Sequence, residues 1–166
     1  LAAVVLCSAY QSAHALGVFA SWWQMDENSA DGFGFGIRER INFTHLIGIE
    51  GRASWISFSD VIPSSGGVNP PADDSADVIP LEVMGVVSLH HFYGGLGVGY
   101  YMFDSEAASL SDEVGWFGLV GIELGLGPVK VFADVKWTQV EVDVETTTQS
   151  FNADGIGTNV GVALRI

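Results

Sequence analysis

Basic residues are scarce in this sequence: Lys and Arg together number six, against 20 Asp and Glu, in a chain of 166 residues. Six bases cannot form the positive stripe that follows a phosphate backbone, so nucleic-acid binding is excluded. The single cysteine, Cys7, rules out a disulfide framework and a cysteine-based zinc site. Yet 48% of the residues are apolar and 11% are aromatic, which is not the composition of a disordered acidic chain. The length suits one folded domain.

A long apolar run is also missing, although residues 1–25 contain no Asp, Glu, Lys or Arg. The apolar run at 1–7 gives way to polar residues and is followed by the triplet Ala13-His14-Ala15. A short apolar stretch followed by such an A-x-A triplet is typical of the end of a secretory signal. We therefore expect 1–15 to be a signal-peptide remnant and 16–166 to be the mature domain of an exported protein.

Helical spacing is absent too, since no stretch after residue 16 keeps a helical apolar period over three turns. What recurs is the alternation of apolar residues with glycine or polar residues. Eight segments show it: 16–25, 32–41, 46–56, 81–89, 94–102, 114–124, 129–138 and 156–166. Most of them have about the nine to eleven residues that a tilted strand needs to cross a bilayer.

The connections between these segments alternate in length. Short ones occupy 42–45, 90–91 and 126–128, and long ones occupy 26–31, 59–79, 104–113 and 143–154. All long loops would then lie at one end of the sheet and all short turns at the other, which is the topology of an outer-membrane barrel. The long loops contain 14 of the 20 acids and none of the six bases.

The side chains on the two faces of these strands differ in size and charge. The interior of an eight-stranded barrel is only just wide enough for side chains, so glycine and paired charges fit inside and bulky apolar residues turn outward. The sequence therefore predicts an all-β fold, a closed antiparallel eight-stranded transmembrane β-barrel. The alternative is a soluble exported barrel that binds an apolar ligand, like a lipocalin.

Several glycine-rich strands carry a family resemblance. The motifs are Gly-Phe-Gly-Phe-Gly at 32–36, Tyr-Gly-Gly-Leu-Gly-Val-Gly-Tyr-Tyr at 93–101, Gly-Ile-Glu-Leu-Gly at 121–125 and the final strand. With them the mature chain resembles the small eight-stranded bacterial outer-membrane barrels of the OmpA-like, Ail/Lom and opacity-type group. In that family the last strand carries an assembly signal. Asn159, Gly161 and Leu164 fit the signal, whereas Ile166 stands where an aromatic residue is usual.

The resemblance implies a place in the bacterial outer membrane, with membrane lipid and lipopolysaccharide as neighbours. It also implies the barrel-assembly machinery as a partner, and we expect a monomer. The function that we expect is a structural or surface-interaction role. Acidic loops would repel lipopolysaccharide phosphates unless divalent cations bridge the two, and would attract a cationic extracellular partner.

Charged residues on the inward strand faces form a candidate lumen network: Arg38, Arg40, Glu50, Arg52, Glu123, Asp134 and Lys136. These residues could line an ion path. In so narrow a barrel, however, mutual pairing is the expected state, because an unpaired buried charge is unfavourable. We expect Arg52 and Lys136 to pair with Glu50 and Glu123 across the lumen and to plug it.

Aromatic residues gather toward both ends of the strands. The five tryptophans lie toward the long loops with Tyr100 and Tyr101, while Phe43, Phe92 and Tyr93 lie at the short-turn end. We interpret them as interfacial girdles, and a sugar-binding platform is the alternative. The main anchors would be Trp22, Trp55, Tyr100, Trp116 and Trp137.

Enzyme chemistry would need a His near a Ser and a carboxylate at the outer rim, as in a lipase-like site. His45, His90 and His91 instead lie in or beside the short turns, so we expect neither catalysis nor a cofactor. The acids Asp26, Asp31, Asp73, Asp74 and Asp77 offer oxygen ligands but lack the downstream Glu of a calcium hand. We assign no metal site to them; adventitious Ca²⁺ or Mg²⁺ binding and plainly solvated loops are both open.

Overall fold

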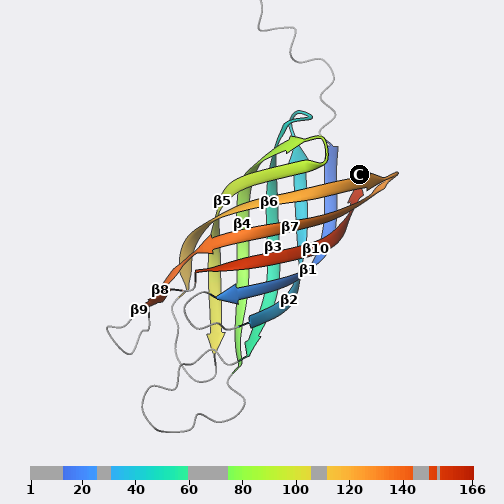
Figure 1. The fold of residues 1–166 in the computed structure, drawn as a ribbon. Helices are drawn as coiled ribbons and strands as arrows, with labels where there is room; N and C mark the ends of the chain where they lie inside the picture. The colour runs from blue at the N-terminus through green and yellow to red at the C-terminus, as the bar shows by residue number, and fades with distance from the viewer. Residues whose placement is uncertain (1–12, 26–30, 60–74, 106–111, 144–149, 153) are drawn as a thin grey trace, which may run out of the picture.

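Alternation along a strand sends successive side chains to opposite faces, and the computed structural model arranges these strands as a closed barrel (Figure 1). The structure describes residues 13–25, 31–59, 75–105, 112–143, 150–152 and 154–166. Within these ranges no helix is long and apolar enough to cross a membrane.

Eight antiparallel strands form the barrel in the order β1-β10-β7-β6-β5-β4-β3-β2. They are β1 (Ala13–Met25), β2 (Asp31–Asn42), β3 (Ile47–Ser59), β4 (Ser75–Leu89), β5 (Phe92–Ser105), β6 (Glu113–Leu126), β7 (Val129–Gln139) and β10 (Gly155–Arg165). Strand β10 pairs with both β7 and β1 and so closes the barrel. The predicted closed eight-stranded antiparallel barrel is confirmed.

Most of the strands extend further toward the long loops than the alternation alone predicts. Strand β4 begins at Ser75 and pairs with β3 as far as Ser59, so the second half of the expected 59–79 loop is partly strand. Strands β8 (Glu141–Asp143) and β9 (Ser150–Asn152) form a small separate sheet at the expected 143–154 loop. The predicted strands end too early because the prediction used the alternation of outward apolar residues. Inward side chains nearer the long loops, such as Val78 and Phe103, continue to pack in the interior.

Strand β1 begins before the expected mature start. Ala13 pairs with Asn42, and Ala15 pairs with both Arg40 and Arg165. The last three residues of the expected signal segment 1–15 therefore take part in the barrel, while 1–12 lie outside the described residues. The cleavage site itself stays a prediction.

The outer face of the barrel is apolar along every strand. On β2, Phe33, Phe35 and Ile37 are 67%, 64% and 55% exposed, while Arg38 and Arg40 on the other face are buried. Such an exterior suits hydrocarbon and not water, which argues against the lipocalin-like alternative. Glu39 is an outward charge near the end of β2, and its Oε1 lies 3.6 Å from His14 Nδ1.

Candidate functional site: the ion-paired interior

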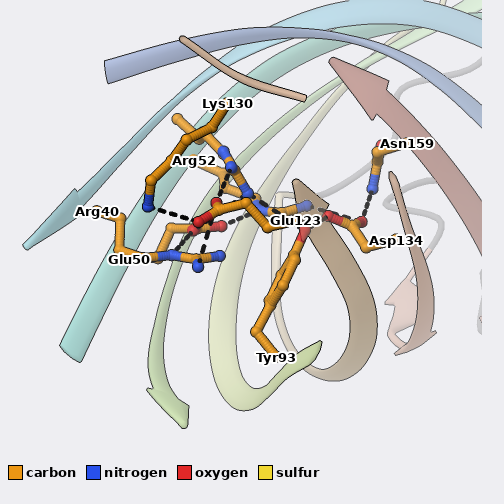
Figure 2. Close-up of polar contacts among 9 residues, drawn as sticks. Arg40, Glu50, Arg52, Tyr93, Glu123, Lys130, Asp134 and Asn159 are labelled. Atoms are coloured by element: carbon orange, nitrogen blue, oxygen red, sulfur yellow. Dashed lines mark hydrogen bonds and ion pairs between the residues drawn. The ribbon is translucent and has the colours of Figure 1, made fainter. Parts of the chain in front are cut away.

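Inward-facing residues of six strands meet in one cluster of charges inside the barrel (Figure 2). We call it the central charge cluster; its members are Arg38, Arg40, Glu50, Arg52, Tyr93, Glu123, Lys130, Asp134 and Asn159. Members that come from the same strand are an even number of positions apart, because alternate side chains share a face. Arg38 and Arg40 come from β2, and Glu50 and Arg52 come from β3.

Glu50 is fully buried and lies among three arginines. Arg40 Nε donates to its Oε2 at 2.5 Å, and Arg52 Nε donates to its Oε1 at 2.7 Å. Arg38 Nη1 lies 3.5 Å from Oε2. A buried carboxylate with this many charged donors is well compensated, and each arginine depends on it in turn.

Asp134 receives hydrogen bonds from three residues. Arg52 donates to both of its oxygens, at 3.1 and 2.7 Å, Tyr93 Oη donates at 2.6 Å, and Asn159 Nδ2 donates at 2.7 Å. Gly121 makes room for this contact, since a Cβ there would lie 2.7 Å from Cζ of Tyr93 and from Cβ of Asp134. The fork of Arg52 on a carboxylate fixes the orientation of both side chains.

Glu123 is the third acid, and it lies nearest the short turns. Its Oε2 accepts from Arg38 Nη2 at 2.8 Å and its Oε1 accepts from Lys130 Nζ at 2.6 Å. Arg40 Nη1 lies 3.5 Å from the same Oε2. Glu123 is 14% exposed at its side chain, whereas Glu50 is not exposed at all.

The central charge cluster contains more positive than negative charge. Its four bases face three carboxylates, and within the described part of the chain Arg38 Nε and Arg40 Nη2 have no hydrogen-bond acceptor. Aromatic rings stabilise part of the excess: the Arg38 guanidinium lies 3.2 Å from the ring centre of Phe132, and that of Arg40 lies 4.2 Å from Tyr93.

Three further groups fill the interior. Glu82 accepts from Lys136 Nζ at 2.5 Å and from Tyr101 Oη at 3.0 Å. Beyond them, toward the long loops, lies the long-loop apolar cluster, which consists of Trp23, Met25, Ile56, Phe58, Ala76, Val78, Tyr101, Phe103 and Val140. A second set of buried apolar residues, the middle apolar cluster, surrounds the charges: Phe19, Met84, Val86, Tyr93, Phe117, Leu119 and Phe132.

All seven residues of the predicted lumen network lie inside the barrel, but their pairing differs from the expectation. Arg52 contacts Glu50 and Asp134, while Lys136 contacts Glu82 and not Glu50 or Glu123. Lys130, Tyr93 and Asn159 also belong to the observed cluster, although the predicted network does not contain them. Position parity could have identified Tyr93, because it shares the inward face of β5 with Gly95, Gly97 and Gly99.

The predicted aromatic anchors lie on the outer surface. Trp22, Trp55, Tyr100, Trp116 and Trp137 are all exposed, and Trp116 and Trp137 meet edge to face at 5.3 Å. The wider girdle interpretation is wrong for Trp23, Tyr93 and Tyr101, which are buried inside. Each follows the parity of its strand, which places it on the inner face regardless of its height.

Only two of the acids considered as metal ligands, Asp31 and Asp77, lie among the described residues, and they lie on different strands. Asp26, Asp73 and Asp74 lie outside the described residues. Asp77 lies within β4 opposite Ser57 and accepts a hydrogen bond from Trp55 Nε1 at 3.2 Å, and Asp31 begins β2 opposite Gln24. Among the described residues no group of three or more potential His, Cys, Asp or Glu ligands is found.

The family model described as outer membrane protein beta-barrel domain matches residues 1–166. The outer membrane protein OprG from Pseudomonas aeruginosa is 15% identical, with a TM-score of 0.63, over 93% of this chain and 96% of that one. Neisserial surface protein A is 14% identical, with a TM-score of 0.62, over 93% and 97%.

The attachment invasion locus protein Ail of Yersinia pestis is 16% identical, with a TM-score of 0.51, over 93% of this chain and 97% of that one. No curated protein matches the chain. Because these identities are low, the likeness to the three solved structures shows that this chain shares their barrel fold and nothing further.

Proposed function

This chain belongs to the outer membrane protein beta-barrel domain family, and from that premise we propose that it is a non-conducting barrel that presents acidic loops at the cell surface. Its location is the bacterial outer membrane, so lipid and lipopolysaccharide surround it. The barrel acts as a rigid mount, and the interaction role belongs to the loops. The barrel-assembly machinery would insert it.

The filled interior is the observation that carries the proposal. The central charge cluster joins β2, β3, β5, β6, β7 and β10 through hydrogen bonds and ion pairs. An ion passing along the axis would have to separate these pairs, which is unfavourable in a low-dielectric interior. The buried apolar residues around the charges and toward the long loops leave little room for a continuous water path.

The charge of the long loops supports a surface role. These segments hold 14 acids without a compensating base, whereas the remaining six acids are matched by six bases. The resulting field attracts cations within about 8 Å at physiological salt. The partner we propose is a cationic molecule or an anionic neighbour bridged by Ca²⁺ or Mg²⁺.

Catalysis is not part of this proposal. His90 and His91 form the turn between β4 and β5, and His45 lies between β2 and β3, at the short-turn end. None of them lies near the outer rim, where a lipid-modifying triad would act.

Conductance in a planar bilayer tests the plugged lumen. The refolded protein should insert without steady ohmic current, because ion pairs and apolar side chains block the axis. The double variant Arg52→Ala with Asp134→Ala removes one ion pair from the lumen but leaves the apolar clusters in place, so it should conduct at most slightly more than the parent. Steady current of the open-porin kind from the parent protein would refute the proposal.

The loop charges are tested by changing Asp73, Asp74 and Asp77 together to Asn and measuring binding of Ca²⁺ and of a basic protein to intact cells at low and high salt. Binding should weaken, and the loss should shrink at high salt because salt screens exposed charges. Asp77→Asn alone is the control, since it alters the contact with Trp55 and leaves the other two charges in place. Unchanged binding by a folded triple variant would reduce the loop to a solvated cap.

A further inference from the structure

The short-turn end of the barrel contains a polar cavity of about 360 Å³. Three bases line it, Arg40, Lys130 and Arg165, with Glu123 as the one acid among the described lining residues. We call this cavity the short-turn mouth. Its walls come from the starts and ends of strands and from the turns that join β2 to β3 and β4 to β5.

The wall of the short-turn mouth has unused positive charge. Glu123 already accepts from Arg38 and Lys130, and Arg40 lies near it as well. Arg40 is 3% exposed at its side chain, yet its Nη2 has no acceptor among the described residues. Arg165 is exposed at the end of β10 and forms no ion pair with a described carboxylate. A cavity lined by three bases and by one acid that already has its own partners is a place where an added anion would be stabilised.

The turn at His90 also points to this cavity. His90 has a φ of 60°, which is uncommon for residues other than Gly, although Asn, Asp and His adopt it more often than other residues do. Two-residue hairpin turns need a positive φ at their first residue and favour Gly, Asn or Asp there. A histidine at this position is strained, and its side chain lines the short-turn mouth, whereas the neighbouring His91 does not. Strain retained in this way is typical of a functional position.

We propose that the short-turn mouth binds a phosphate group, either free phosphate or the headgroup of a phospholipid. A tetrahedral oxyanion has several acceptors, which suits the separate donors of Arg40, Lys130 and Arg165 better than a single carboxylate does. In outer-membrane barrels the short turns face the periplasm, where inner-leaflet headgroups lie at the same height. The ligand would also neutralise the excess positive charge of the central charge cluster.

Titration calorimetry with inorganic phosphate tests the proposal on the whole refolded chain in nonionic detergent micelles, which carry no phosphate. We expect saturable binding that added sodium chloride weakens. Arg165→Gln should weaken it about tenfold, the loss of one charge-assisted hydrogen bond, and Arg165→Lys should keep most of it. Arg165 is exposed, so these variants should leave the fold intact.

The two adjacent histidines supply a matched pair of variants. His90→Ala should weaken phosphate binding several-fold, and His91→Ala should leave it unchanged, although both change the same turn. Absence of saturable phosphate binding by the parent protein would overturn the proposal. So would binding that neither Arg165→Gln nor His90→Ala affects, because the anion would then lie elsewhere.

Repeating the titration in phosphatidylglycerol nanodiscs distinguishes the two sources of the phosphate group. If the bilayer abolishes binding of free phosphate, a headgroup occupies the short-turn mouth. If binding persists, the ligand is a soluble phosphate. Either result requires the micelle experiment to be positive.

Discussion

The two ends of the barrel interior are filled by different kinds of side chain, charged toward the short turns and apolar toward the long loops. Toward the short turns, the central charge cluster holds Glu50 among three arginines, with hydrogen bonds down to 2.5 Å. Toward the long loops, the long-loop apolar cluster packs Trp23 between Phe58 and Tyr101, at ring-centre distances of 5.6 and 5.9 Å. Both fill the same narrow space, and both exclude solvent from their largest side chains.

The difference between the two regions lies in how each fails. A buried ion pair adds little net stability relative to an apolar filling, but loss of one partner is strongly destabilising because the other charge is left buried. An apolar cluster loses stability in proportion to the volume removed. Removing one member of an ion pair should therefore be strongly destabilising in the central charge cluster. In the long-loop apolar cluster, stability should fall gradually as side chains become smaller.

Glu50→Ala should have the largest effect on stability. A small effect would contradict the proposed difference between the central charge cluster and the long-loop apolar cluster. Removing the carboxylate leaves Arg38, Arg40 and Arg52 with fewer acceptors and should lower the free energy of unfolding by about 3–5 kcal/mol. Denaturant unfolding in detergent measures the loss, and export should not change. Glu39→Gln is the control, since that outward carboxylate is more than half exposed. Equal stability of Glu50→Ala and the parent would contradict the prediction.

Ile56→Ala should destabilise the barrel by about 2–4 kcal/mol, because Ile56 is buried in the long-loop apolar cluster. Ile56→Val should lower the free energy of unfolding by about 1 kcal/mol, as a smaller cavity forms. The same denaturant titration measures both variants. A loss that does not scale with the volume removed would show that this region does not behave as a packed core.

Tyr93→Phe removes one hydroxyl between Arg38 and Asp134 and should reduce the free energy of unfolding by about 1–2 kcal/mol. The reduction is modest because Asp134 keeps its bonds from Arg52 and Asn159. Thermal unfolding followed by near-ultraviolet circular dichroism measures it. Tyr100→Phe is the matched control, because that exposed hydroxyl contacts only the rim residue Asp112 among the described residues. A larger loss for Tyr100→Phe than for Tyr93→Phe would contradict the prediction that the buried hydroxyl contributes more to stability than the exposed one.

The smallest effect should come from the outer rim. Asp77→Asn alters an exposed bond to Trp55 Nε1 and should change the free energy of unfolding by less than about 0.5 kcal/mol. Tryptophan fluorescence during unfolding follows it directly. A loss comparable to that of Tyr93→Phe would mean that the rim takes part in holding the barrel closed.

Alternation was enough to predict the eight strands of the barrel, their pairing order and the faces on which the charges lie, but not the small sheet of β8 and β9. It predicted Arg38, Arg40 and Arg52 inside because they share a parity with glycines. It did not predict their partners, because the tilt of the strands decides which inward residues reach one another across the lumen. Lys136 meets Glu82 for this reason.

Trp23 and Tyr101 were assigned to the membrane interface from their height along the strand, although their parity places them inside. The short-turn mouth could not be predicted at all. Its residues come from six strands and two turns, and only the closed structure brings Arg40, Lys130 and Arg165 together.

The pairing of β1 with β10 has a consequence for the order in which the protein folds. Leu16 pairs with Leu164 and Val18 with Val162, so the first and last strands of the barrel must find each other across almost the whole chain. Contacts this distant in sequence form late, because the entropy of closing so large a loop is lost before any other contact offsets it. Until that seam forms, both strands expose unpaired backbone groups, which invite pairing with other chains. Aggregation during biogenesis should therefore depend on the time this seam stays open, whatever the final stability of the closed barrel.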